Sequence, residues 1–229
     1  MPELARRIEQ AESYPFARPP VSYLFADGRM RPLDDFSPDG RTPVIACGSN
    51  AAPERLAAKF PSDETIPVTR ARLRHYAVVY SAHVSSYGAV PATLHPCPGS
   101  ETELFITWLD ERQLERMHAT EGVGMRYDYV ELGGLELLVD RHGRLHAAGA
   151  YLSRNGALRL TGDPVRLAEV PTRDCGFEAR SQPWMLRYLH ARFAPDLSYR
   201  SFMAAVMHDA RYRATVTARL ARRETLDAD

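Results

Sequence analysis

The pattern of apolar and polar positions divides the chain into a strand-rich middle and a helical end. Short apolar or alternating runs are typical of strands. We expect strands at 44–47, 72–80, 89–94, 103–109, 127–132, 135–139 and 145–152. Wider apolar spacing predicts helices over 181–193, 198–208 and 209–223. This order is not the regular alternation of a doubly wound sheet. We predict an α+β fold: a small mixed β-barrel or curled sheet with flanking helices, plus C-terminal helices.

The first forty residues differ in composition from the rest of the chain. Residues 2–14 predict a short helix, and 15–43 are rich in proline and turn signals, with one candidate strand at 21–25. We therefore interpret 1–42 as a Pro-rich N-terminal extension and 43–205 as the domain proper. Residues 206–229 are interpreted as a C-terminal helical extension.

One candidate site follows the strand at 44–47. That run is continuously apolar, which predicts a strand buried on both faces, and it breaks into the turn Gly48-Ser49-Asn50 before a helix. Asn50 is the expected N-cap of this helix. Backbone N–H groups at such a turn, together with the helix N-terminus, attract anionic ligands. An ordinary strand–turn–helix junction is the alternative.

A second candidate is the glutamate at the end of a predicted helix. Asp110 is the expected N-cap, and Gly122 is the expected residue after the last turn. Glu121 then faces the negative end of the helix dipole, a placement that costs stability when the group is ionised. Such local conflicts are more frequent at functional sites. A surface glutamate near a helix end is the alternative interpretation.

Composition excludes several classes of protein. Basic and acidic residues balance at 29 each, so no overall field favours nucleic acid or membranes. The N-terminus is too charged for a signal peptide, and no run reaches the ~20 apolar residues of a membrane span. The three cysteines form no C-x-x-C pair, which indicates a reducing, cytoplasmic location. We attribute the single lysine among 28 arginines to the codon usage of a GC-rich genome.

No cofactor or metal is expected from the motifs. The chain contains no P-loop, G-x-S-x-G or dinucleotide-binding fingerprint. His142 and His146 have a spacing that suits zinc on a helix, but here it spans a predicted hairpin turn. The two rings therefore do not share a face.

These segments, taken in order, resemble the gamma-glutamylcyclotransferase-like family. Ile45-Ala46-Cys47-Gly48-Ser49-Asn50 resembles the strand and Y-G-S-N motif of that family, and 114–127 resembles its L-D-x-x-E-G-V…Y segment. Ala92-Thr93-Leu94 and Pro98-Gly99-Ser100 are similar to the region between the two motifs. The resemblance covers roughly residues 44–205. It implies a small mixed barrel with flanking helices and no cofactor.

The resemblance also implies an activity and a set of site residues. The expected reaction is cyclisation of a γ-glutamyl group to 5-oxoproline with release of an amine or amino acid. Glu121 would be the general acid/base. The residues expected to bind the substrate are Cys47, Gly48, Ser49, Asn50 and Tyr127. Tyr129 lies on the same face of its strand as Tyr127, so the two assignments are interchangeable at this point.

Two departures from the family pattern leave a second hypothesis open. Cys47 replaces the aromatic residue before Gly48, and His118 replaces an aspartate. The chain would then be a catalytically silent member of the fold that binds a small acidic metabolite or a protein partner. Cys47 itself is expected to be a buried small hydrophobe rather than a nucleophile. The leaving amine of the substrate and the oligomeric state stay undetermined.

Overall fold

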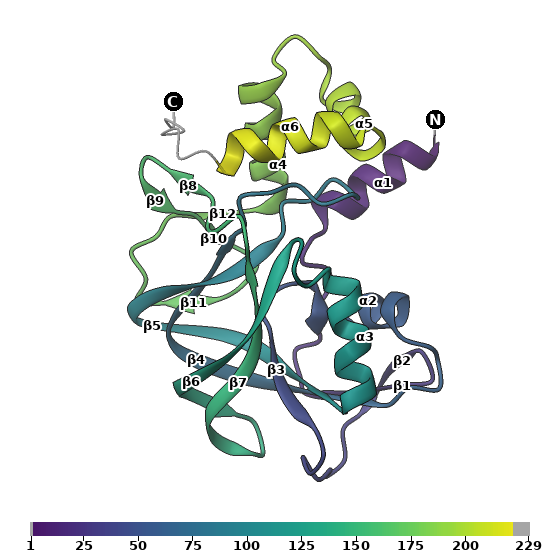
Figure 1. Ribbon diagram of the computed structural model, residues 1–229, viewed down its shortest axis with the longest axis vertical. Helices are drawn as coiled ribbons and strands as arrows, with labels where there is room; N and C mark the ends of the chain where they lie inside the picture. The colour runs from purple at the N-terminus through teal and green to yellow at the C-terminus, as the bar shows by residue number, and fades with distance from the viewer. Residues whose placement is uncertain (1, 222–229) are drawn as a thin grey trace.

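A closed five-stranded β-barrel forms the centre of the molecule (Figure 1). The computed structural model describes residues 2–221. The barrel strands are β3 (Thr42–Ala46), β4 (Ile66–Tyr80), β5 (Ala92–Leu109), β6 (Tyr127–Val139) and β7 (Gly143–Ser153). Their order is β5-β3-β7-β6-β4, and β4 pairs with β5 to close the barrel. Because β3 pairs with β7 in parallel and the other pairs are antiparallel, the sheet is mixed. The predicted fold class is confirmed.

Short strands extend the barrel at its edges. A hairpin of β1 (Tyr23–Ala26) and β2 (Arg29–Pro32) pairs with β4. Three more short strands join the barrel sheet: β10 (Arg166–Leu167), β11 (Thr172–Arg173) and β12 (Ala179–Arg180). β8 (Arg159–Leu160) and β9 (Asp163–Pro164) pair with each other as a separate two-stranded sheet. The first forty residues thus contain a hairpin where we expected one strand.

The helices form two groups, one along the side of the barrel and one at its end (Figure 1). The first group, α2 (Pro53–Lys59) and α3 (Glu111–Glu121), packs beside the barrel. The second group consists of α1 (Pro2–Glu12), α4 (Gln182–Phe193), α5 (Tyr199–His208) and α6 (Ala210–Ala221). Residues 222 and 223 of the last predicted helix, and the rest of the predicted extension to 229, lie outside the described residues. Across 2–221, no helix combines the length and apolar character needed to cross a membrane.

The predicted separation of the strands at 89–94 and 103–109 is wrong, because Pro96-Cys97-Pro98-Gly99 between them lie within the single strand β5. A β-bulge accommodates them. Tyr76 pairs with Pro96 and Arg74 with Glu101, so residues 97–100 lie opposite His75 alone. Gly99 adopts a φ of 87°, and its N–H donates to His75 Nδ1 at 3.0 Å. A bulge tolerates proline, which a regular ladder does not. A second register shift, between Gly133 and Leu137, likewise joins two predicted strands into β6.

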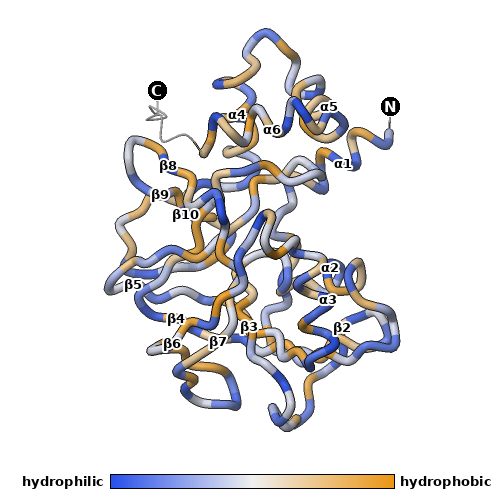
Figure 2. Tube along the Cα trace, in the orientation of Figure 1, coloured by the Kyte–Doolittle hydropathy of each residue, from blue (hydrophilic) through white to orange (hydrophobic). Residues whose placement is uncertain are grey.

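Two apolar clusters hold the fold together. One fills the barrel, where Ile106 pairs with Ile45 on one side and with Thr69 on the other. The other joins α2 and α3 to the outer barrel wall, through Leu56 and Met117, both fully buried. Figure 2 shows the corresponding hydrophobic stretches along the barrel strands. The second cluster fixes the two helix ends at which the candidate site residues lie.

Shortening a side chain inside the barrel should be costly. Ile106 is 0% exposed, so Ile106→Ala is expected to lower the free energy of unfolding by about 2–5 kcal/mol, since the cavity cannot collapse within a closed sheet. Ile106→Val should cost about 0.5–1.5 kcal/mol. Urea denaturation measures both, with Met125→Ala, 77% exposed, as the neutral control. Equal stability of Ile106→Ala and the control would contradict this account of the core.

Candidate active site

All six predicted site residues line one cavity of about 310 Å³. The structure brings together Cys47, Gly48, Ser49, Asn50, Glu121 and Tyr127. They come from the end of β3, the turn before α2, the end of α3 and the start of β6. Residues about seventy positions apart in sequence therefore meet at one place.

The turn after β3 has a different geometry from the one expected. Ser49–Ala51 form a 3-10 turn, and α2 starts later, with Ala52 at its N-cap and Pro53 in its first turn. The prediction of Asn50 as N-cap is therefore wrong. The extra turn frees its side chain, whose Nδ2 donates to Glu121 Oε1 at 3.1 Å and whose Oδ1 accepts from Lys59 Nζ at 2.6 Å.

Gly48 has a steric requirement imposed by the N-terminal segment. A Cβ at position 48 would lie 2.3 Å from the hydroxyl oxygen of Tyr14. That hydroxyl accepts a hydrogen bond of 2.8 Å from the N–H of Ala92, so it cannot simply move aside. Only glycine fits here, and Tyr14 forms part of the cavity wall.

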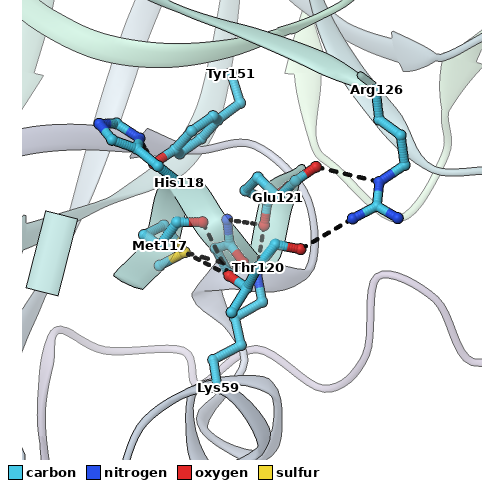
Figure 3. A network of polar contacts seen from close by, with 8 residues as sticks. Lys59, Met117, His118, Thr120, Glu121, Arg126 and Tyr151 are labelled. Atoms are coloured by element: carbon cyan, nitrogen blue, oxygen red, sulfur yellow. Dashed lines mark hydrogen bonds and ion pairs between the residues drawn. The ribbon is translucent and has the colours of Figure 1, made fainter. Parts of the chain in front are cut away.

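Glu121 is held at the end of α3 by an ion pair and a hydrogen bond (Figure 3). Gly122 ends the helix in the left-handed conformation, with a φ of 67°, as predicted. Lys59 Nζ and Asn50 Nδ2 both donate to Glu121 Oε1. Among residues 2–221, no side chain or backbone group forms a hydrogen bond or ion pair with Oε2 of Glu121. Burial raises the pKa of Glu121, but the charge and hydrogen bond of Lys59 outweigh it, and the net shift is downward. The carboxylate is therefore ionised at neutral pH.

Lys59 is a site residue that we did not predict from the sequence. Its side chain is 10% exposed and that of Glu121 15%, so the pair is largely removed from water. The signal was present in the composition, because Lys59 is the only lysine beside 28 arginines. A compact ammonium suits this narrow position, where Lys59 also contacts Met117 Sδ at 3.6 Å.

The structure separates the two tyrosines that shared a strand face. Tyr127 lines the cavity, whereas Tyr129 packs against His118 and Tyr151, with ring centroids 4.5 and 5.4 Å away. His118 Nδ1 lies 2.9 Å from the hydroxyl of Tyr151, which itself lines the cavity. His118 itself does not line the cavity but contacts Tyr151, which does.

Cys47 does not have the properties of a nucleophile. Burial raises the pKa of its thiol to about 12, and Glu121 adds to the rise. Because the thiolate is the reactive form, a thiol in this environment is inert at neutral pH.

Positive charge surrounds the carboxylate. Arg55, Arg126 and Arg213 line the cavity together with Lys59, and Glu121 is the one carboxylate among the lining residues. The Arg55 guanidinium packs on the rings of Phe16 and Tyr87, 5.0 and 5.4 Å from their centroids, and these rings lie next to each other with centroids 6.1 Å apart. No carboxylate within the described chain pairs with it, and its Nε is buried without a hydrogen bond. A fixed, uncompensated guanidinium is a binding group for an anion. Among residues 2–221, no group of three or more His, Cys, Asp or Glu could hold a metal.

Comparison with known proteins shows a distant likeness of fold. The sequence matches no protein-family model and no curated protein. The Arabidopsis thaliana protein At5g39720.1 is 20% identical over 53% of this chain and 76% of its own, with a TM-score of 0.42. The Homo sapiens uncharacterized protein loc79017 is 18% identical over 73% and 88%, with a TM-score of 0.43. A gamma-glutamyl cyclotransferase is 17% identical over 78% and 99%, with a TM-score of 0.41. Solved structures similar in fold thus include a protein of the kind that the motifs resemble, and at these identities the likeness says nothing of activity.

Removing the lysine should change how Glu121 titrates. In Lys59→Met the burial remains but the opposing charge is lost, so the pKa of Glu121 should rise above its ordinary value. The carboxylate would then take up a proton at a higher pH than in the wild type. Carbon-13 NMR of the labelled glutamate side chains measures this shift. Lys59→Arg, which keeps the charge, should leave the pKa low, and an unshifted titration in Lys59→Met would contradict the assigned pairing.

Proposed function

We propose that the protein cyclises a γ-glutamyl compound to 5-oxoproline and releases an amine. One observation carries this proposal. Asn50 of the Gly48-Ser49-Asn50 turn donates a hydrogen bond to one carboxylate oxygen of Glu121, and both residues line the same cavity. The other carboxylate oxygen has no hydrogen-bond partner in the described chain. Asn50 and Lys59 occupy Oε1, so Oε2 is available to a substrate. An α-ammonium group is a suitable donor to a fixed, ionised carboxylate.

The reaction requires positioning and proton transfer. The attacking nitrogen starts as an ammonium with three hydrogens and ends in the lactam with one, so two protons pass from it to the departing nitrogen. The α-amine of the substrate attacks its own γ-carbonyl, so holding the chain in a folded shape supplies much of the acceleration. Glu121 accepts a proton from the α-ammonium and returns it to the departing amine. Because its pKa is lowered, Glu121 is a weak base. An ammonium nitrogen has no free electron pair, so this proton must leave before the N–C bond forms, and a weak base keeps only a small fraction of the bound substrate in the reactive amine form.

The turn after β3 and Arg55 are suited to bind the negatively charged groups of a substrate. Ser49 and Asn50 begin a 3-10 turn, where the first N–H groups have no partner within the turn. They would bind the α-carboxylate of the glutamyl group. Arg55 lies elsewhere on the cavity wall and would bind a second carboxylate on the leaving amine. The substrate class is then a γ-glutamyl amino acid or peptide.

Neutralising the proposed acid/base should abolish turnover. Glu121→Gln keeps the size of the side chain but cannot exchange the proton, so 5-oxoproline release should fall at least about 10²-fold. The matched control is Glu115→Gln, an exposed glutamate on the same helix, which should retain wild-type activity. Release is measured across a panel of γ-glutamyl compounds. Full activity in Glu121→Gln would contradict the mechanism, and silence of folded wild-type protein across the panel would favour a non-catalytic binding protein.

Arg55 should discriminate between two matched substrates. γ-Glutamyl-alanine and γ-glutamyl-ethylamine differ only in the carboxylate of the leaving group. In Arg55→Met, kcat/KM for the alanine compound should fall about 10–100-fold, the worth of a charged hydrogen bond, and that for the ethylamine compound by no more than about threefold. Arg55→Lys should recover part of the preference. Equal losses on both substrates would contradict the role of Arg55.

A further inference from the structure

A buried histidine in the cavity wall has no role in the steps described so far. His83 follows β4, is 5% exposed, and lines the same cavity as Glu121. Its ring packs edge-on against Tyr127, with centroids 5.7 Å apart. The ring position is therefore fixed beside a residue of the candidate site.

A chain of hydrogen bonds determines which ring nitrogen of His83 carries the proton. The N–H of Asn155 donates to Ser153 Oγ at 3.2 Å. Ser153 Oγ lies 2.6 Å from Ser81 Oγ, which lies 2.6 Å from His83 Nδ1. If Ser153 donates to Ser81 and Ser81 to Nδ1, each hydroxyl hydrogen has an acceptor. The reverse direction leaves the hydroxyl hydrogen of Ser153 without one among the described residues, so the first is favoured.

This direction makes the other ring nitrogen a donor. With Nδ1 accepting from Ser81, the neutral ring carries its hydrogen on Nε2. Among residues 2–221, no group forms a hydrogen bond with Nε2, and Nε2 is not among the buried side-chain atoms left without a partner, so it is accessible to a ligand in the cavity. Burial lowers the pKa of His83 to about 4, and Arg126 acts in the same direction against the smaller effect of Glu121. The ring is therefore neutral at pH 7 and presents an unused N–H to the cavity.

We propose that His83 is a second catalytic residue, whose Nε2–H donates a hydrogen bond to the γ-carbonyl oxygen as that oxygen becomes an oxyanion. This inference rests on the proposed function. Attack by the α-amine forms the N–C bond and moves the carbonyl π electrons onto the oxygen. Glu121 passes its first proton to the leaving nitrogen and takes a second one from the ring nitrogen. When the C=O bond re-forms, the C–N bond to the leaving group breaks, and the departing amine takes this second proton to become an ammonium ion. His83 keeps its own proton throughout. Ser81 is a positioning residue, because it acts by holding the tautomer.

Substitution of His83 tests the role in turnover. Removing one oxyanion donor typically lowers kcat by about 10²–10³-fold, and His83→Leu should lose this much with KM changed by less than about threefold. His83→Gln restores an N–H near the position of Nε2 and should recover part of the loss. Thermal unfolding of each variant confirms that it is folded. Unchanged kcat in folded His83→Leu would overturn the inference, as would equal losses in the Leu and Gln variants.

Nitrogen-15 NMR of the histidine rings supplies a readout that does not depend on activity. In the wild type, His83 should carry its proton on Nε2 and should not titrate between pH 5 and 8. In Ser81→Ala the Nε2–H form should decrease and kcat should fall, by less than in His83→Leu. A wild-type ring protonated on Nδ1 would overturn the inference.

The two proposals fail in different ways. If the wild type releases 5-oxoproline, Glu121→Gln does not, and His83→Leu does, only the role of His83 is overturned. If the folded wild type releases no product, both proposals are overturned.

Discussion

The site depends on the neutralisation of one buried carboxylate. Glu121 lies at the negative end of α3 and out of water, and both features oppose its ionised form. Lys59 at the end of α2 reverses this balance, and Asn50 adds a hydrogen bond. Because removing one partner from a buried ion pair leaves the other charge uncompensated, this pair also couples the two helix ends energetically. The position of the carboxylate and the packing of α2 against α3 are therefore one constraint.

The barrel supplies the frame for that constraint. The parallel pairing of β3 with β7 and the antiparallel pairing of β6 with β7 bring the end of β3 and the start of β6 to the same end of the barrel. The turn at Gly48 and Tyr127 therefore reach the cavity from neighbouring parts of the sheet. The N-terminal segment completes the wall, since Tyr14 occupies the space that a side chain at position 48 would need.

Local signals in the sequence predicted much of this arrangement. The capping residues of α3, the buried run of β3 and the strand–helix order were enough for the barrel class and for the main elements. Predictions failed where distant contacts overrode local ones. Pro98, which would normally end a strand, lies in a bulge opposite His75, and Asn50 binds Glu121 instead of capping a helix. Motif order placed six residues in one cavity, but Lys59, Arg55 and His83 have no motif. Their roles depend on contacts with residues that are distant in sequence and meet only in the folded chain.

The single lysine has a further consequence. The chain has one side-chain amine, and it lies in the wall of the cavity, next to the carboxylate. Acylating reagents that modify amines would, on most proteins, label many surface positions at once. In this sequence Lys59 is the one lysine, and peptide mapping distinguishes its product from that of an α-amine. The rate at which Lys59 is acylated therefore measures how often the ion pair opens. The same rate reports occupancy of the cavity in the wild-type sequence, without a labelled ligand.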